Sequence, residues 1–248
     1  QMATINAAQH FGMERELGAI APGRRADLIL TSDLAELPVE TVIARGRVLA
    51  EGGRLTADIP AYPYPAASRD TVRLARPLAA EDFRVPAPEG AGRVRARVIG
   101  VIENQAPTRA LERELPVEGG AVLPDQSQDV CRIALVERHR GTGAVVNGFV
   151  SGFGYDTTCA MASTVAHDCH HMIVVGTSEA DMAAAANRLA EVGGGVTLWA
   201  GGAERALVEM PIAGLMSDER AEAVAAKAAR LGEAMRACGC TLNNAYMQ

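Results

Sequence analysis

The sequence predicts an α+β protein in which a small β unit precedes a larger domain of mixed strands and helices. Three observations lead to this prediction. β-branched residues alternate around Gly46, buried-strand patterns recur between residues 92 and 210, and helical spacing is found over 178–192, among these strands, and over 217–237, after them. Strands and helices mixed in this order favour an α+β or α/β domain over a repeat array.

The composition bounds the class of protein. A chain of 248 residues can bury a sizeable core, which must consist of aliphatic side chains because hydrophobic residues make up 48% and aromatic residues 4%. A net charge of −6 argues against nucleic-acid and anionic-membrane partners. No apolar run approaches the roughly 18 residues of a membrane-spanning helix. Five cysteines without a CxxC motif indicate a reducing, cytoplasmic setting.

The first 91 residues predict two segments. Apolar residues at helical spacing end at Gly12, a strand is expected over Ala26–Leu30, and a hairpin is expected around Gly46. The proline-rich stretch 61–91 has little periodicity, so we expect an extended linker there. The chain is therefore divided into residues 1–60, a linker over 61–91 and a domain over 92–248.

The third segment predicts alternating strands and helices. Two or three strands are expected after Gly92, and further strands are expected at Val130–Val136, Ala144–Val150, Met172–Val175, Val196–Ala200 and Arg205–Met210. Ser178 is a suitable N-cap for a helix that ends before Gly193. Ser217 is expected to cap a second helix that runs to Ala237, with acidic residues in its first turn.

The densest group of chemically active side chains is His167, Asp168, His170 and His171, directly before the apolar run that starts at Met172. In a helix His167 and His171 would share one face, and in a strand they would share a face with Cys169. Either arrangement could present ligands to a divalent ion, with Asp168 as a ligand or as the group that orients one. The alternative is a hydrogen-bonded polar network that holds a strand and a loop together.

A second candidate group comprises Arg138 and His139, flanked by Glu137 and Arg140. Arginine beside histidine could bind an anion or stack on a purine. The alternative is an exposed turn with an internal ion pair of little energetic weight.

Several of these segments resemble one family. ATINAAQHFG followed by GAIAPGRRADLIL resembles the end of the catalytic barrel of amidohydrolases and the return of the chain to their small β domain. VERHRGTG, ASTVAHDCHHMIVVGT, NRL before three glycines and PIAGLMSDE together resemble the C-terminal domain of the bacterial adenine deaminase family. The chain has HDCHH where the family has HDSHN, so His171 can imitate an amide side chain only in part.

The resemblance implies a metal-dependent hydrolysis of adenine to hypoxanthine and ammonia. It also implies a binuclear Mn²⁺ or Fe²⁺ centre, with ligands and catalytic residues in a barrel outside this chain, so the segment is expected to be inactive alone. His167, Asp168 and His171 remain weak metal candidates within the chain. The expected partners are adenine, the protein's own catalytic barrel and further copies in a homo-oligomer.

Two other functions stay open at this point. The α+β domain could act as a binding or assembly module, either as a lid over the active site or as a subunit interface. The parent protein could also be another amidohydrolase that acts on a cyclic amide or amidine.

Overall fold

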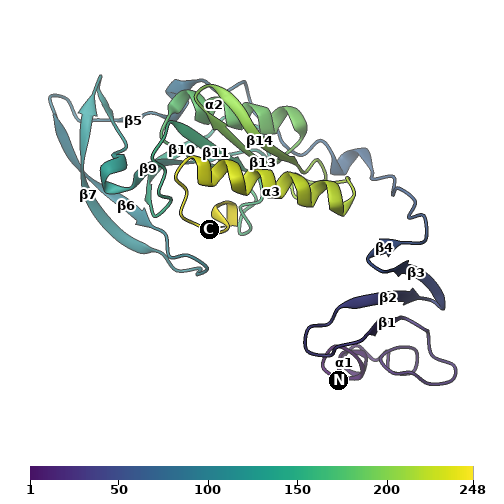
Figure 1. The fold of residues 1–248 in the computed structure, drawn as a ribbon. Helices are drawn as coiled ribbons and strands as arrows, with labels where there is room; N and C mark the ends of the chain where they lie inside the picture. The colour runs from purple at the N-terminus through teal and green to yellow at the C-terminus, as the bar shows by residue number, and fades with distance from the viewer. Residues whose placement is uncertain (248) are drawn as a thin grey trace. The chain divides into compact units, whose positions relative to one another are not determined.

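The computed structural model describes residues 1–247 and confirms the mixed α+β class (Figure 1). It divides into two compact units, Gln1–Pro63 and Tyr64–Gln248. Each unit contains its own β-sheet, and the residues described include no (β/α)₈ barrel. No helix among residues 1–247 is both long enough and apolar enough to cross a membrane.

The first unit is a short helix, α1 (Ile5–His10), followed by a sheet of four antiparallel strands in sequential order. The strands are β1 (Leu28–Thr31), β2 (Val39–Ala44), β3 (Arg47–Glu51) and β4 (Arg54–Leu55). The expected hairpin around Gly46 is confirmed, with Gly46 at a φ of +74° that suits glycine. The Asp27 carboxylate accepts a hydrogen bond from the Arg45 amide at 2.7 Å and so fixes the start of this turn.

The second unit is built on an open sheet of ten strands in the order β14-β13-β11-β12-β9-β10-β6-β7-β8-β5. Its strands are β5 (Val85–Pro86), β6 (Arg93–Gly100), β7 (Arg109–Glu118), β8 (Ala121–Val122), β9 (Val130–Val136), β10 (Val145–Ser151), β11 (Cys159–Ser163), β12 (Met172–Gly176), β13 (Gly195–Ala200) and β14 (Ala203–Glu209). The pairing between β6 and β10 is parallel, and the other pairings of this sheet are antiparallel.

Two helices cover opposite faces of this sheet. Helix α2 (Glu179–Val192) packs on the face that carries Ala160 and Ala162, and α3 (Ala221–Ala237) packs on the face that carries Met161. Successive side chains of a strand point to opposite faces, so β11 contributes to both cores. The predicted cap of α2 is confirmed, because Ser178 Oγ accepts the Asp181 amide at 3.2 Å and Gly193 ends the helix at a φ of +83°.

The predicted start of the last helix at Ser217 is wrong. Helix α3 begins at Ala221, after Arg220, and Ser217 Oγ accepts only the Glu219 amide in a local turn. Tertiary ion pairs occupy the acidic residues that were expected in the first turn. Asp218 pairs with Arg69 at 2.7 Å, and Lys227 binds both Glu209 and Glu219.

Strand β11 was not predicted, although it is an interior strand, paired on both sides and third from the β14 edge of the sheet. Its sequence, CAMAS, contains no β-branched residue, and all five residues are buried. Without alternation or β-branched side chains, no local signal separates such a strand from a buried helix or loop.

The predicted linker over 61–91 is corrected to a boundary at Pro63 and a packed segment after it. Phe83 is fully buried in the α2 core, and the Leu78 amide and carbonyl both bond the Asn187 side chain at 2.8 Å. Proline removes amide donors but leaves side chains and carbonyls free to pack and accept. A proline-rich stretch can therefore be extended and still form part of a domain.

Candidate functional site

The histidine-rich stretch forms the loop between β11 and β12, in which residues 167–169 make a turn. Neither the helical nor the extended arrangement considered from the sequence is therefore correct, because the chain reverses direction here. His167 and Asp168 lie at the tip, with side chains 65% and 95% exposed, and their closest charged atoms are 3.8 Å apart. An exposed pair at that distance contributes little to stability.

His139 and His170 contact the backbone of this loop, although His139 itself is exposed. His170 Nδ1 lies 2.7 Å from the Val165 carbonyl oxygen, and His139 Nε2 lies 3.1 Å from the Cys169 carbonyl oxygen. A carbonyl can only accept, so each of these nitrogens donates a proton to the loop backbone. The His171 ring packs against His139 with centroids 4.7 Å apart, and its buried Nδ1 has no hydrogen-bond partner among the residues described.

The three metal candidates do not converge. His167 and Asp168 point into solvent at the loop tip, whereas the His171 ring packs on His139. Within residues 1–247, no group of three or more His, Cys, Asp or Glu side chains is placed to hold a metal ion. A structural or catalytic divalent site needs at least three such ligands at short range, so the donor set of this loop does not fit a metal centre.

Arg138 holds the loop from inside the domain. It follows β9, and its side chain is buried, with the residue 1% exposed. Its Nε donates to the His170 carbonyl at 2.6 Å, its Nη1 to Thr71 at 3.1 Å and its Nη2 to Ala213 at 3.1 Å. A longer contact of 3.5 Å reaches the Thr164 carbonyl. Burial lowers the pKa of this guanidinium, but arginine stays charged at neutral pH.

The backbone around Arg138 is held in uncommon conformations. His170 and Ala213, whose carbonyls bind the guanidinium, have φ values of +53° and +58°. A left-handed backbone conformation at a non-glycine residue destabilises the folded state by on the order of 1 kcal/mol, and the hydrogen bonds to the buried cation offset this destabilisation. Gly214 lies directly against Arg138, since a Cβ on it would come within 2.8 Å of Nη1. Thr164 Oγ1 completes the cluster by donating to the Gly214 carbonyl at 2.6 Å and accepting the Gly195 amide at 2.8 Å.

Glu137 organises the neighbouring turn. Its carboxylate accepts hydrogen bonds from the amides of His139, Arg140 and Thr142 and from the Thr142 hydroxyl, at distances of 2.6 to 3.0 Å. These donors, the Thr142 amide above all, lower the pKa of Glu137 from its ordinary 4.5 to about 2. Glu137 thus binds backbone amides instead of forming the internal ion pair that was considered from the sequence.

Three of the four segments that carried the family resemblance meet at this place. VERHRGTG supplies Arg138, the histidine stretch supplies Thr164 and His170, and PIAGLMSDE supplies Ala213 and Gly214. Thr164, Ala213 and Gly214 were not predicted to be part of a site. An arginine two residues after the end of a buried strand was the available signal, because a cation that stays close to the core must find acceptors inside the protein.

We expect Arg138→Lys to lower the free energy of unfolding by about 3 kcal/mol, because a lysine amine cannot reach four carbonyls on three segments and leaves some of them unsatisfied. Urea unfolding at pH 7 measures this loss. Arg140→Lys, on an exposed neighbour with no side-chain partner in the part of the chain described, is the matched control and should change stability by less than about 0.5 kcal/mol. Equal stability of the two variants would contradict the role given to Arg138.

We expect Glu137→Gln to lower the free energy of unfolding by about 1 kcal/mol or less at pH 7. The loss is small because solvent screens the partly exposed carboxylate. The unfolded carboxyl binds its proton near pH 4.5 and the folded one near pH 2, so the contribution is complete above about pH 4.5 and disappears as the pH falls to about 2. Urea unfolding at pH 7 and at pH 2.5 should therefore show the difference between wild type and variant shrinking with acid. A difference that stays constant would disprove the low pKa.

Comparison with known proteins shows which families the two parts of the chain match. Residues 105–248 match the family model described as the adenine deaminase C-terminal domain, and residues 1–49 match the amidohydrolase family model. Adenine deaminase 3 of Rhizobium meliloti (strain 1021) is 71% identical over 248 residues, which are 100% of this chain and 42% of the relative.

Relatives of lower identity carry the same name. The adenine deaminase of Mesorhizobium japonicum is 67% identical and that of Rubrobacter xylanophilus 47%, each over the whole chain and 41% of the relative. The chain thus spans about two fifths of the length of these curated relatives. The resemblance drawn from its motifs is confirmed: the chain belongs to the adenine deaminase family and contains the C-terminal domain characteristic of that family.

Proposed function

We propose that this chain is part of a metal-dependent adenine deaminase that converts adenine and water to hypoxanthine and ammonia. The observation that carries the proposal is the alignment of proteins named adenine deaminase, at 47 to 71% identity, with every residue of the chain. The order of the two family matches supports it, because an amidohydrolase segment precedes the adenine deaminase domain.

The chemistry is assigned to the rest of the parent enzyme. We propose a Mn²⁺ or Fe²⁺ centre held by barrel residues outside this chain, since the side chains of the histidine loop do not fit a metal site. The chain's own contribution is binding and positioning. Five free cysteines accord with a reducing cytoplasm as the place where the enzyme works.

The loop of residues 166–170 is proposed as the surface that this domain presents to the catalytic barrel. Its tip is exposed while its base is fixed by Arg138 and by the His170 and His139 bonds to its backbone. A polar tip on a rigid base can place hydrogen-bonding groups at a neighbouring site with little loss of entropy on binding. An accessory element that positions groups or excludes water at an active site needs these properties.

We expect the isolated 248-residue chain to show no adenine deamination above a blank of metal alone, with Mn²⁺ or Fe²⁺ added. The reason is that its described residues offer no convergent ligand set that could activate water. Ammonia release from adenine measures the activity. Metal-dependent turnover above the blank would refute the assignment of the chemistry to residues outside this chain.

In the full-length enzyme, we expect the double variant His167→Ala, Asp168→Asn to lower kcat/KM for adenine about tenfold or more with an unchanged melting temperature. Both side chains are exposed, so their loss removes contacts to the barrel and leaves the domain core intact. The matched control is Glu118→Gln, which changes another exposed acid. Normal turnover with altered subunit association would favour a subunit interface over an active-site element.

A further inference from the structure

Two buried arginines, one in β9 and one shortly after it, differ in what balances their charge. Arg132 is 3% exposed, and its Nη2 lies 2.9 Å from Glu179 Oε1. Arg138 is 1% exposed and is bound by backbone carbonyls, with no carboxylate partner among residues 1–247. Replacing a buried charge by a well-packed apolar side chain is often neutral or stabilising. The chain therefore keeps at position 138 a group that stability alone does not require.

The backbone near Arg138 gives up stability as well. In the described part of the second unit, five residues other than glycine have a positive φ, namely Asn104, Asp129, Ala166, His170 and Ala213. Asparagine and aspartate adopt this conformation readily, whereas the Cβ of alanine disfavours it. Ala166 begins the histidine loop, where its carbonyl accepts the Cys169 and His170 amides at 3.1 and 2.7 Å, and the Ala213 carbonyl binds Arg138. The least favourable conformations of this unit thus lie in the loop and in the turn beside it.

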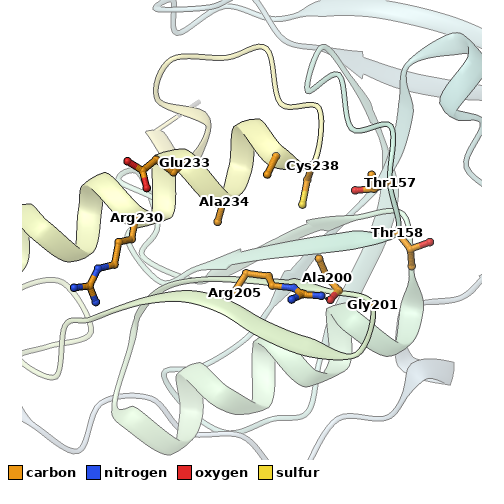
Figure 2. A pocket seen from close by; sticks show the side chains of 10 residues that line it. Thr157, Thr158, Ala200, Gly201, Arg205, Arg230, Glu233, Ala234 and Cys238 are labelled. Atoms are coloured by element: carbon orange, nitrogen blue, oxygen red, sulfur yellow. Dashed lines mark hydrogen bonds between the residues drawn. The ribbon is translucent and has the colours of Figure 1, made fainter.

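A surface hollow elsewhere in the same unit lacks these features (Figure 2). It lies between α3 and the turn that joins β13 to β14, and its charged side chains, Arg205, Arg230 and Glu233, are exposed. Among its lining residues, all of which are described, only Gly201 has a positive φ, and glycine adopts that conformation without strain. Buried uncompensated charge and backbone strain are therefore particular to the histidine loop and its supports.

The loop is held at two consecutive carbonyl groups. Arg138 Nε donates to the His170 carbonyl at 2.6 Å, and His139 Nε2 donates to the Cys169 carbonyl at 3.1 Å. These peptide groups directly follow the exposed tip, His167 and Asp168. Fixing them restricts the conformations of the tip, so that its polar side chains lose little entropy when they meet a neighbouring group.

Features that cost stability are kept where they serve a function. We propose that Arg138 and His139 are positioning residues for adenine deamination, which hold the histidine loop in the conformation that presents its tip to the catalytic barrel. This role rests on the function proposed above and extends it from the tip side chains to the residues that hold the loop backbone. Neither residue contacts adenine in this role, and a shift of about 1 Å in a positioning element can lower a rate roughly 100-fold. Loss of either residue therefore lowers kcat and leaves KM nearly unchanged.

Steady-state kinetics of the full-length enzyme with adenine test this role first at His139, which is exposed. In His139→Phe the ring packing on His171 is kept and only the donor to the loop is lost. We expect kcat to fall at least about tenfold, with KM within about threefold of wild type and an unchanged melting temperature. His139→Gln should return kcat to within about threefold of wild type, because a glutamine amide can donate from the place of imidazole Nε2.

The buried residue needs a matched control, because Arg138→Lys also lowers stability. Arg132→Lys changes the other buried arginine, whose partners, Glu179 and the Val122 carbonyl, lie outside the loop. Circular dichroism at the assay temperature gives the folded fraction, so that kcat can be expressed per folded molecule. We expect Arg138→Lys to lose at least about tenfold in this kcat, and Arg132→Lys to stay within about twofold of wild type.

Three outcomes would overturn the positioning role. They are a normal kcat in folded His139→Phe and Arg138→Lys, a rise in KM with kcat unchanged, and equal losses of kcat in Arg138→Lys and Arg132→Lys. Each of these leaves the proposed adenine deaminase activity intact. A wild-type enzyme that does not deaminate adenine would instead overturn the proposed function together with this role.

Discussion

A positive charge lies buried at the end of β9 without a carboxylate partner among residues 1–247, and backbone carbonyls solvate it instead. Arg138 binds the carbonyls of Thr71, Thr164, His170 and Ala213, which come from three separate stretches of chain. Removing a charge from water is costly, so this arrangement is stable only while all these stretches keep their positions. The guanidinium thereby makes the histidine loop and the segment before η2 (Ala80–Phe83) parts of one cooperative unit.

The small side chains of the core let its elements approach closely. A Cβ on Gly176 would lie 2.7 Å from Ala160 Cβ and 2.9 Å from Met182 Cγ, so glycine is required where α2 crosses β11 and β12. Alanines 185 and 186 of α2 are fully buried against the same sheet. A core with few aromatic residues gains its stability from such close contact of many small groups, which explains the composition of the chain.

Strand β11 is the support from which the histidine loop extends. Thr157 and Thr158, which line the hollow between α3 and the β13–β14 turn, precede the strand, and the histidine loop follows it. All five residues of β11 are buried, and the strand pairs with β12 on one side and β13 on the other. Because β11 is hydrogen-bonded on both sides, it holds the residues before it and the histidine loop after it in fixed positions on the domain.

The sequence by itself determined the fold class, the caps of α2, most strands and the family, because these depend on local periodicity, turn residues and short motifs. Tertiary contacts decided three features of the fold. Ion pairs of Asp218 and Glu219 moved the start of α3, and burial on both faces of the sheet made residues 159–163 the strand β11. Hydrogen bonds from Asn187 helped to pack residues 64–91 onto the domain. The same holds within the candidate site. The motif located the histidines, but only the fold showed that His167 and Asp168 face solvent while Arg138 is buried. The reason is that a polar side chain can be buried only where partners distant in the sequence, such as the His170 carbonyl for Arg138, lie within reach.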